Sequence, residues 1–179
     1  MLFGLWVGFC CIVFFGLYRG FIFPLFGTSG DEAFIAFCSL ALFFGQDGNN
    51  KKLPSFICSG ICGAIWGFIF VLGVGVLMPI FGYNFVPAAM LDILVFTALA
   101  ILVHTFFLAK TVFNNMAYVF LGVATTFSGT VAAGALGIAQ ISLLLFCGMM
   151  IGTASNALAP KIFGPPPPVE QAASMEKAV

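Results

Sequence analysis

Three ionisable side chains lie within otherwise apolar stretches of the chain: Arg19, Asp92 and His104. Ionisable groups in such surroundings are costly to bury, so each raises a functional hypothesis that needs a named partner. Arg19 and Asp92 are expected at similar depth, where pairing would keep both groups charged. The pair would form either an anion or proton site or, as we favour, a structural ion pair. His104 could relay protons near neutral pH, although a hydrogen bond to a neighbouring helix is the commoner role.

A second group of candidate residues lies in two short apolar segments and combines aromatic, glycine and hydroxyl side chains. Aromatic constrictions and neutral hydrogen-bonding groups suit a small uncharged polar solute, whereas charged solutes need rings of charge. The same small and hydroxyl residues also serve ordinary packing between membrane helices. The candidate pore-lining residues are Phe43, Phe127, Ser39, Thr125, Thr126, Ser128, Gly45 and Gly129.

The sequence lacks the combinations of residues that catalytic and metal-binding sites need. The chain has one histidine, and no nucleophile stands beside a base. Cys58 and Cys62 lie four residues apart, on one helical face, but neither has a histidine or carboxylate beside it in the sequence. We interpret them as packing residues rather than as a metal or redox pair. We therefore expect no enzyme activity, no cofactor and no metal site.

The composition places the chain in a lipid bilayer. Of its 179 residues 62% are hydrophobic and 7% are charged, and the net charge is zero. A soluble domain is roughly 25% charged, so this chain has too little polar surface to coat a globule in water. The absence of a basic patch excludes a nucleic-acid partner. The apolar run at the N-terminus is interpreted as the first membrane span and not as a cleaved signal peptide.

The apolar segments predict an all-α polytopic membrane protein that crosses the bilayer about six times. The second and fifth segments are too short for a comfortable span, and the count drops to four if they are re-entrant. Residues 1–163 would form the transmembrane domain, and the proline-rich residues 164–179 a disordered cytoplasmic tail. The six segments cover residues 2–23, 33–45, 53–79, 85–109, 116–128 and 138–158.

The positions of the lysines indicate that both termini are cytoplasmic. The first connection on the opposite side holds Asp31 and Glu32, and the connections on that side have no Lys or Arg. Positive residues concentrate in cytoplasmic loops, which fixes the orientation. Arg19 is the exception, within the outer end of the first segment. The cytoplasmic lysines would be Lys51, Lys52, Lys110, Lys161 and Lys177.

An internal similarity suggests two inverted repeats, at about residues 1–80 and 85–163. Residues 33–45 resemble residues 117–129, and each half reads as a long, a short and a long segment. Three spans per half mean that the second half enters the membrane upside down. Chance similarity between apolar segments is the alternative. In transporters, paired short segments at matching positions mark the substrate path. The identities are Ala33 with Ala117, Phe43 with Phe127, and Gly45 with Gly129.

Several short motifs resemble those of domain-of-unknown-function family 1097, which comprises small bacterial inner-membrane proteins. They are residues 43–48, Ser59-Gly60 followed by Trp66, and residues 122–129. The resemblance covers residues 34–158. The Pro-Gly pair usual before the fifth segment is replaced here by Met116-Ala117. The resemblance implies an inner-membrane location and no known enzyme chemistry.

We expect a channel or facilitator for a small neutral polar solute such as urea, ammonia or a short polyol. The alternatives are a proton-coupled transporter that uses Asp92, Arg19 and His104, and a membrane scaffold that docks proteins through its tail. Partners would be the lipid bilayer, the solute and further copies of the chain, for example in a trimer. Stripes of small residues would hold the helices or the subunits together. They are Ser59, Gly63 and Gly67 in one half, and Gly148 and Gly152 in the other.

Overall fold

The computed structural model describes residues 2–28, 30–128 and 131–164, and over these residues the chain is helical and contains no strand. Gly129 and almost all of the proline-rich tail lie outside the described residues. By length and apolar composition, the long helices are those of a multi-pass membrane protein. Among the described residues, four helical stretches are long enough to cross a membrane: Phe3–Leu25, Asn50–Leu77, Phe85–Phe107 and Gly134–Ile162.

Six α-helices carry the described part of the fold, and short helical turns extend or connect them. The first and fourth helices each continue into a π-helical turn, Tyr18–Ile22 and Val103–Phe107. Turns of 3-10 helix lie at Phe23–Leu25, Asp31–Ala33 and Asn50–Lys52. The α-helices are α1 (Leu2–Leu17), α2 (Phe34–Gly45), α3 (Leu53–Leu77), α4 (Phe85–Leu102), α5 (Met116–Thr126) and α6 (Gly134–Phe163).

Two asparagines begin helices in the second half of the chain. The side chain of Asn84 accepts a hydrogen bond from the backbone N–H of Val86 at 3.2 Å, before α4. Asn115 accepts one from the N–H of Tyr118 at 3.2 Å, before α5. Such caps satisfy amide groups that have no partner within the helix. They fix where the fourth and fifth apolar segments start.

The sixth helix is longer than the apolar segment at residues 138–158 that the sequence predicts. It begins at Gly134, which adopts a φ of +62°, a conformation that costs glycine little. It continues through Pro160 to Phe163. Pro160 has no backbone N–H to donate, but it lies three residues before the helix ends.

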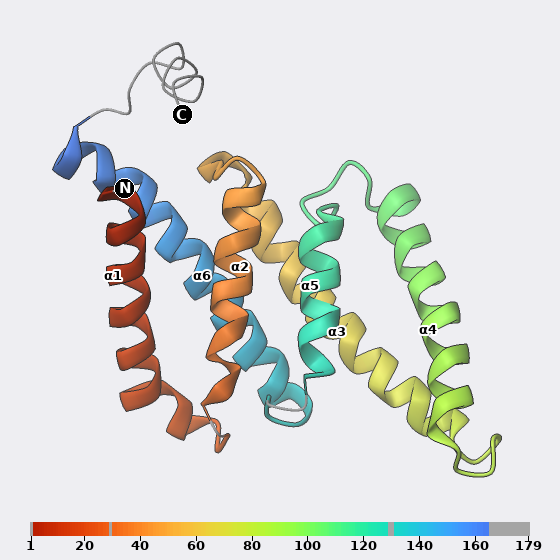
Figure 1. Ribbon diagram of the computed structural model, residues 1–179. Coiled ribbons are helices and arrows are strands. Elements are labelled where there is room, and N and C mark those ends of the chain that lie inside the picture. The colour runs from red at the N-terminus through yellow and green to blue at the C-terminus, as the bar shows by residue number, and fades with distance from the viewer. Residues whose placement is uncertain (1, 29, 129–130, 165–179) are drawn as a thin grey trace, which may run out of the picture.

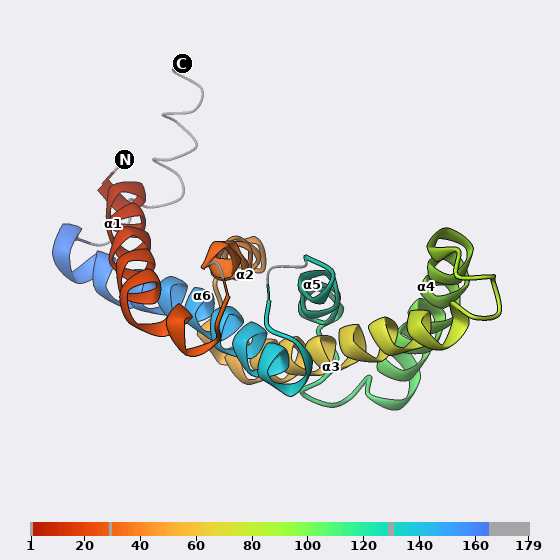
Figure 2. The same cartoon turned by 90° about the horizontal axis from the view of Figure 1, so that it is seen from below.

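The helices form two layers (Figures 1 and 2). The long helices α3 and α6 run obliquely and form the back of the molecule, while α2 and α5 stand side by side in front of them. The helices α1 and α4 lie at opposite ends. With 12 and 11 residues, α2 and α5 are about 18 and 17 Å long, well short of the roughly 30 Å hydrocarbon core.

Glycines on the long helices receive the short helices in close contact. A Cβ atom at Gly63 of α3 would lie 2.1 Å from the carbonyl oxygen of Val119 on α5. A Cβ at Gly148 of α6 would lie 2.1 Å from the carbonyl oxygen of Ala36 on α2. Only glycine permits backbones to approach so closely. The glycine stripes predicted from the sequence therefore join helices within one chain.

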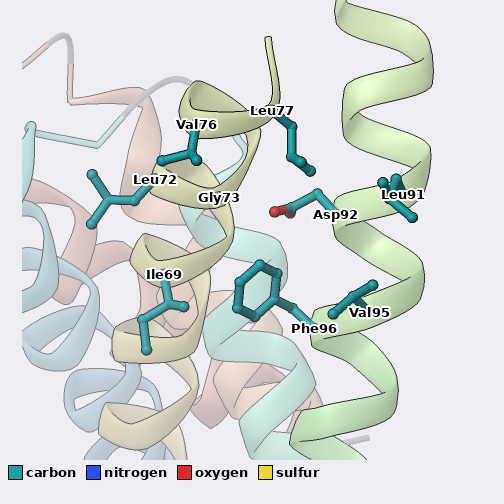
Figure 3. Close-up of a pocket in the computed structure, with 9 residues that line it drawn as sticks. All are labelled: Ile69, Leu72, Gly73, Val76, Leu77, Leu91, Asp92, Val95 and Phe96. Carbon is teal, nitrogen blue, oxygen red and sulfur yellow. The ribbon is translucent and has the colours of Figure 1, made fainter. Parts of the chain in front are cut away.

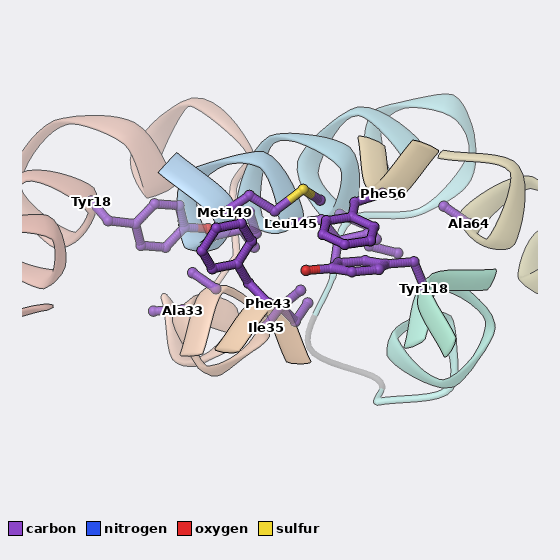
Figure 4. Close-up of a cluster of buried hydrophobic side chains, with 12 residues drawn as sticks. Tyr18, Ala33, Ile35, Phe43, Phe56, Ala64, Tyr118, Leu145 and Met149 are labelled. Carbon is purple, nitrogen blue, oxygen red and sulfur yellow. The ribbon is translucent and has the colours of Figure 1, made fainter. Parts of the chain in front are cut away.

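A cluster of buried side chains lies where α2, α3, α5 and α6 meet (Figure 4). Phe56 of α3 stacks on Tyr118 of α5 with ring centroids 4.8 Å apart, and Phe43 of α2 packs against Phe56. The hydroxyl of Tyr118 donates a hydrogen bond to the carbonyl of Ser39 at 3.1 Å. Because both short helices contribute to this cluster, it fixes their positions against the back layer.

Candidate functional site

An open groove of about 650 Å³ runs between the two short helices. Its walls carry small and apolar side chains from α2 and α5, and no charged residue lines it. Such a surface gives an ion no counter-charge, so it favours a neutral solute over an ion. The lining residues are Cys38, Ala41, Leu42, Gly45, Ala117, Phe120, Leu121 and Ala124.

The hydroxyl groups predicted to line a pore each donate a hydrogen bond to a backbone carbonyl. Ser39 is fully buried and donates to Leu145 of α6 at 2.7 Å. Thr125, Thr126 and Ser128 each donate to a carbonyl three residues earlier, at 2.7 to 2.9 Å. Of the predicted lining residues, Gly45 lies on the groove. The prediction for Gly129 falls outside the described residues.

The expectation that Phe43 and Phe127 occupy equivalent places is wrong. Phe43 is fully buried and packs against Gly152, whereas Phe127 is 46% exposed and contacts Phe70. The residue of α5 that packs on the matching glycine, Gly67, is Thr126. Phe43 therefore shares this kind of contact with Thr126, and not with Phe127, the residue that the sequence identities match to it.

The predicted pairing of Arg19 with Asp92 is also wrong. Arg19 lies 3.5 Å from Asp31 and stacks against the rings of Phe15 and Phe23. Asp92 lies on α4, at the opposite end of the molecule from α1. Similar depth in a membrane does not bring two residues together when their helices lie on opposite flanks.

Asp92 faces a second pocket, of about 420 Å³, between α3 and α4 (Figure 3). Its side chain points from α4 toward α3, where Gly73 leaves room for the carboxyl group. The residue is 0% exposed, and neither carboxyl oxygen has a hydrogen-bond partner among the described residues. The other lining residues are Ile69, Leu72, Gly73, Val76, Leu77, Leu91, Val95 and Phe96.

His104 takes the structural role that the sequence favours. It is fully buried in the π-helical turn after α4. The indole N–H of Trp66 donates to its Nε2 at 3.2 Å, which leaves Nδ1 as the donor to the carbonyl of Phe113 at 2.5 Å. Both nitrogens of a neutral ring are thereby used, and this histidine holds α3 and the α4–α5 connection together.

Cys62 gains a neighbour that the sequence does not place beside it. Its sulfur lies 3.6 Å from Nε2 of His104. Among the described residues, no three His, Cys, Asp or Glu side chains gather as a metal site requires. The contact is therefore part of the packing around the histidine.

Two amide side chains connect the ends of the short helices. Gln46 follows the C-terminus of α2, and Asn115 precedes the N-terminus of α5. Asn115 donates to Oε1 of Gln46 at 2.7 Å, and Gln46 donates in return to Oδ1 of Asn115 at 3.3 Å. This pair holds the two walls of the groove together at one end.

A protein-family model matches residues 13–160, and its description is protein of unknown function (DUF1097). The chain belongs to the DUF1097 family. The match covers most of the chain and includes every residue of the groove and of the Asp92 pocket. No curated protein and no solved structure matches this DUF1097 member.

The sequence did not single out a buried polar cluster around Glu32 in this DUF1097 member. Oε1 of Glu32 accepts hydrogen bonds from Tyr18 at 2.8 Å, from Thr28 and from Gln140 at 2.7 Å. Gln140 also accepts from the backbone N–H of Ala132 at 2.8 Å. Glu32 was expected in the short connection after the first segment, and its side chain is 0% exposed. The available signal was Gln140, one of two amide residues within the sixth apolar segment, the other being Asn156.

Proposed function

We propose that this protein is a membrane facilitator for a small neutral polar solute such as urea, ammonia or a short polyol. The solute would move along the groove between α2 and α5. The observation that carries the proposal is the composition of that groove: it lies between two helices too short to span, and uncharged side chains alone line it. An uncharged lining gives an ion no counter-charge, which favours a neutral solute.

We propose further that the groove lies at the interface of two inverted repeats, α1–α3 and α4–α6. The support is a set of matching contacts. Gly63 and Gly67 of α3 receive Val119 and Thr126 of α5, as Gly148 and Gly152 of α6 receive Ala36 and Phe43 of α2. The π-helical turns that follow α1 and α4 also correspond. Transporters place their substrate path between such repeats.

The polar contacts at the two ends of the molecule are consistent with this symmetry. In the first half, Tyr18 of a π-helical turn bonds Glu32, just before α2. In the second half, His104 of the other π-helical turn bonds the carbonyl of Phe113, shortly before α5. Each tie anchors the segment that enters a short helix, although the residues that make it differ.

The setting of the facilitator follows from the same features. We propose the bacterial inner membrane, as the family resemblance implies. We propose that both termini are cytoplasmic, because the lysines gather on one side of the predicted spans. The groove is open along one face of a single chain. We therefore propose a homo-oligomer in which neighbouring copies close the path; a trimer is one such arrangement.

Proton-coupled transport is the alternative function, and one observation, the buried carboxyl group of Asp92, still supports it. Arg19 and His104 have other partners and do not converge on a common site with Asp92. Asp92 alone remains, as a buried carboxyl group without a hydrogen-bond partner. A coupled mechanism would have to use this residue by itself.

Tryptophan at Ala41 or Ala124 should block solute flux. Both alanines are exposed on the groove, one on each short helix, so an indole ring at either position would obstruct the path. We expect flux of the transported solute to fall at least about tenfold, which corresponds to roughly 1.4 kcal/mol in the barrier. Stopped-flow light scattering on proteoliposomes with a panel of neutral solutes measures this effect.

Leu94→Trp is the matched control, because Leu94 is 68% exposed on α4 and lines neither the α2–α5 groove nor the Asp92 pocket. It should leave flux unchanged. The absence of flux above that of empty liposomes for every solute would contradict the facilitator itself. Flux that survives both groove substitutions would contradict the assigned path.

A further inference from the structure

The buried carboxyl of Asp92 has an environment unlike that of any acidic residue discussed above. It lies seven residues into α4, about 10 Å along a helix that is apolar on all sides. Asp31 is exposed beside Arg19, and Glu32 accepts three hydrogen bonds through Oε1. Asp92 has neither a counter-ion nor a hydrogen-bond donor among the described residues.

The pocket excludes an inorganic cation as the partner of this carboxyl. Calcium takes six to eight oxygen ligands, and magnesium requires near-ideal octahedral coordination. Here the side-chain oxygens available are the two of Asp92, and every other lining residue is glycine, aliphatic or phenylalanine. No second titratable side chain lines the pocket from α3 or α4. The nearest such groups on these two helical stretches are Cys62 and His104, which contact each other. His104 lies 12 residues after Asp92, about 18 Å farther along the helix.

An ionised carboxylate in this place would be very unfavourable. Burying a charge without a partner costs many kcal/mol, so such groups take up a proton instead. Both carboxyl oxygens are closed off from solvent. A proton can bind there because, unlike a metal ion, it needs no cavity and no further ligands. We propose that Asp92 is a membrane-embedded proton-binding site, which carries its proton while α3 and α4 are packed as described here and releases it when they separate.

Gly73 makes this link between proton binding and helix packing. A Cβ atom at Gly73 would lie 2.0 Å from Oδ1 of Asp92 and 2.6 Å from the ring of Phe96. The neutral carboxyl therefore fits directly against the backbone of α3. An ionised carboxylate needs water or a cation, and neither can reach it until the two helices move apart. The inference does not depend on the solute or on the α2–α5 groove.

Infrared spectroscopy and carbodiimide labelling test the site directly in the full-length protein in liposomes. At pH 7 the wild type should show the carbonyl stretch of a neutral carboxylic acid, and Asp92→Asn should lose that band. Glu32→Gln identifies any contribution from the other buried carboxyl. Dicyclohexylcarbodiimide should label the Asp92 peptide: the oxygen bonds to the central carbon as the proton moves to nitrogen, and an acyl shift leaves a stable acylurea.

Two alanine variants distinguish proton binding from simple burial. In Gly73→Ala the added methyl group displaces the carboxyl, so the neutral-acid band should shift and labelling should change in rate. Gly75→Ala is the matched control, because a Cβ there meets nothing within 4 Å, and both signals should remain. A band that persists in Asp92→Asn, or an Asp92 peptide that stays unlabelled, would overturn the proposal. An unchanged signal in Gly73→Ala would refute the coupling to helix packing. All these readouts are independent of solute flux.

Discussion

Alanine at Gly63 or at Gly148 is expected to separate a short helix from the long helix behind it. The added methyl group would lie 2.1 Å from a backbone carbonyl oxygen, of Val119 in one case and Ala36 in the other. A side chain can rotate away from such a contact, whereas a helix backbone must move as a whole. We expect a loss near the upper end of the roughly 1–3 kcal/mol typical of overpacking. Unfolding in mixed detergent micelles gives the change in free energy.

The two substitutions should have similar effects if the halves of the chain are inverted repeats. Gly75→Ala serves as the control, because it adds the same methyl group to the last turn of α3, where nothing lies within 4 Å. It should be neutral or slightly stabilising, since alanine is the better helix former. Wild-type stability in both Gly63→Ala and Gly148→Ala would show that the helices do not pack this closely.

Gln140→Leu is expected to destabilise the protein by about 3 kcal/mol, because it leaves buried polar groups without partners. The amide nitrogen of Gln140 lies 2.7 Å from Oε1 of Glu32, and its oxygen accepts from the N–H of Ala132 at 2.8 Å. Leucine fills similar space and makes neither bond. The carboxyl of Glu32 would remain buried with fewer donors. Thermal unfolding of the purified variant measures the loss.

Asp31→Asn provides the comparison for Gln140→Leu. Asp31 neighbours Glu32 in the chain, but its side chain is 71% exposed where it faces Arg19 at 3.5 Å. Exposed ion pairs contribute only about 0–1 kcal/mol, so this variant should unfold almost as the wild type does. Equal stability of Gln140→Leu and Asp31→Asn would contradict the importance of the buried cluster.

The sequence predicted the elements of the fold well because they depend on local patterns. Apolar runs placed the helices, including the two short ones that now appear as α2 and α5. The family resemblance was confirmed by the match over residues 13–160. The end of α6 was missed because Pro160 looks like a stop signal, although near a C-terminus it removes little hydrogen bonding.

The contacts between distant segments could not be read from the same patterns. Arg19 and Asp92 were paired by depth alone, and depth does not say on which flank a helix lies. Glu32 was taken for a loop residue, since its main partner, Gln140, is 108 residues away. The sequence identities matched Phe43 to Phe127, whereas Thr126 makes the contact with a glycine that Phe43 makes, because identities between apolar segments carry little information.

Reaction of Cys38 with a small, charged thiol reagent tests most directly whether the α2–α5 groove is the solute path. Cys38 is exposed and lines the groove. The thiolate, which forms in water and not in lipid, is the nucleophile that attacks such reagents. The other five cysteines would be replaced, and Leu94→Cys in a cysteine-free background would report a lipid-facing position. Our account predicts that Cys38 reacts, that Leu94→Cys does not, and that modification of Cys38 stops solute flux. Continued flux after complete modification, or a Cys38 as unreactive as the Leu94→Cys control, would contradict it.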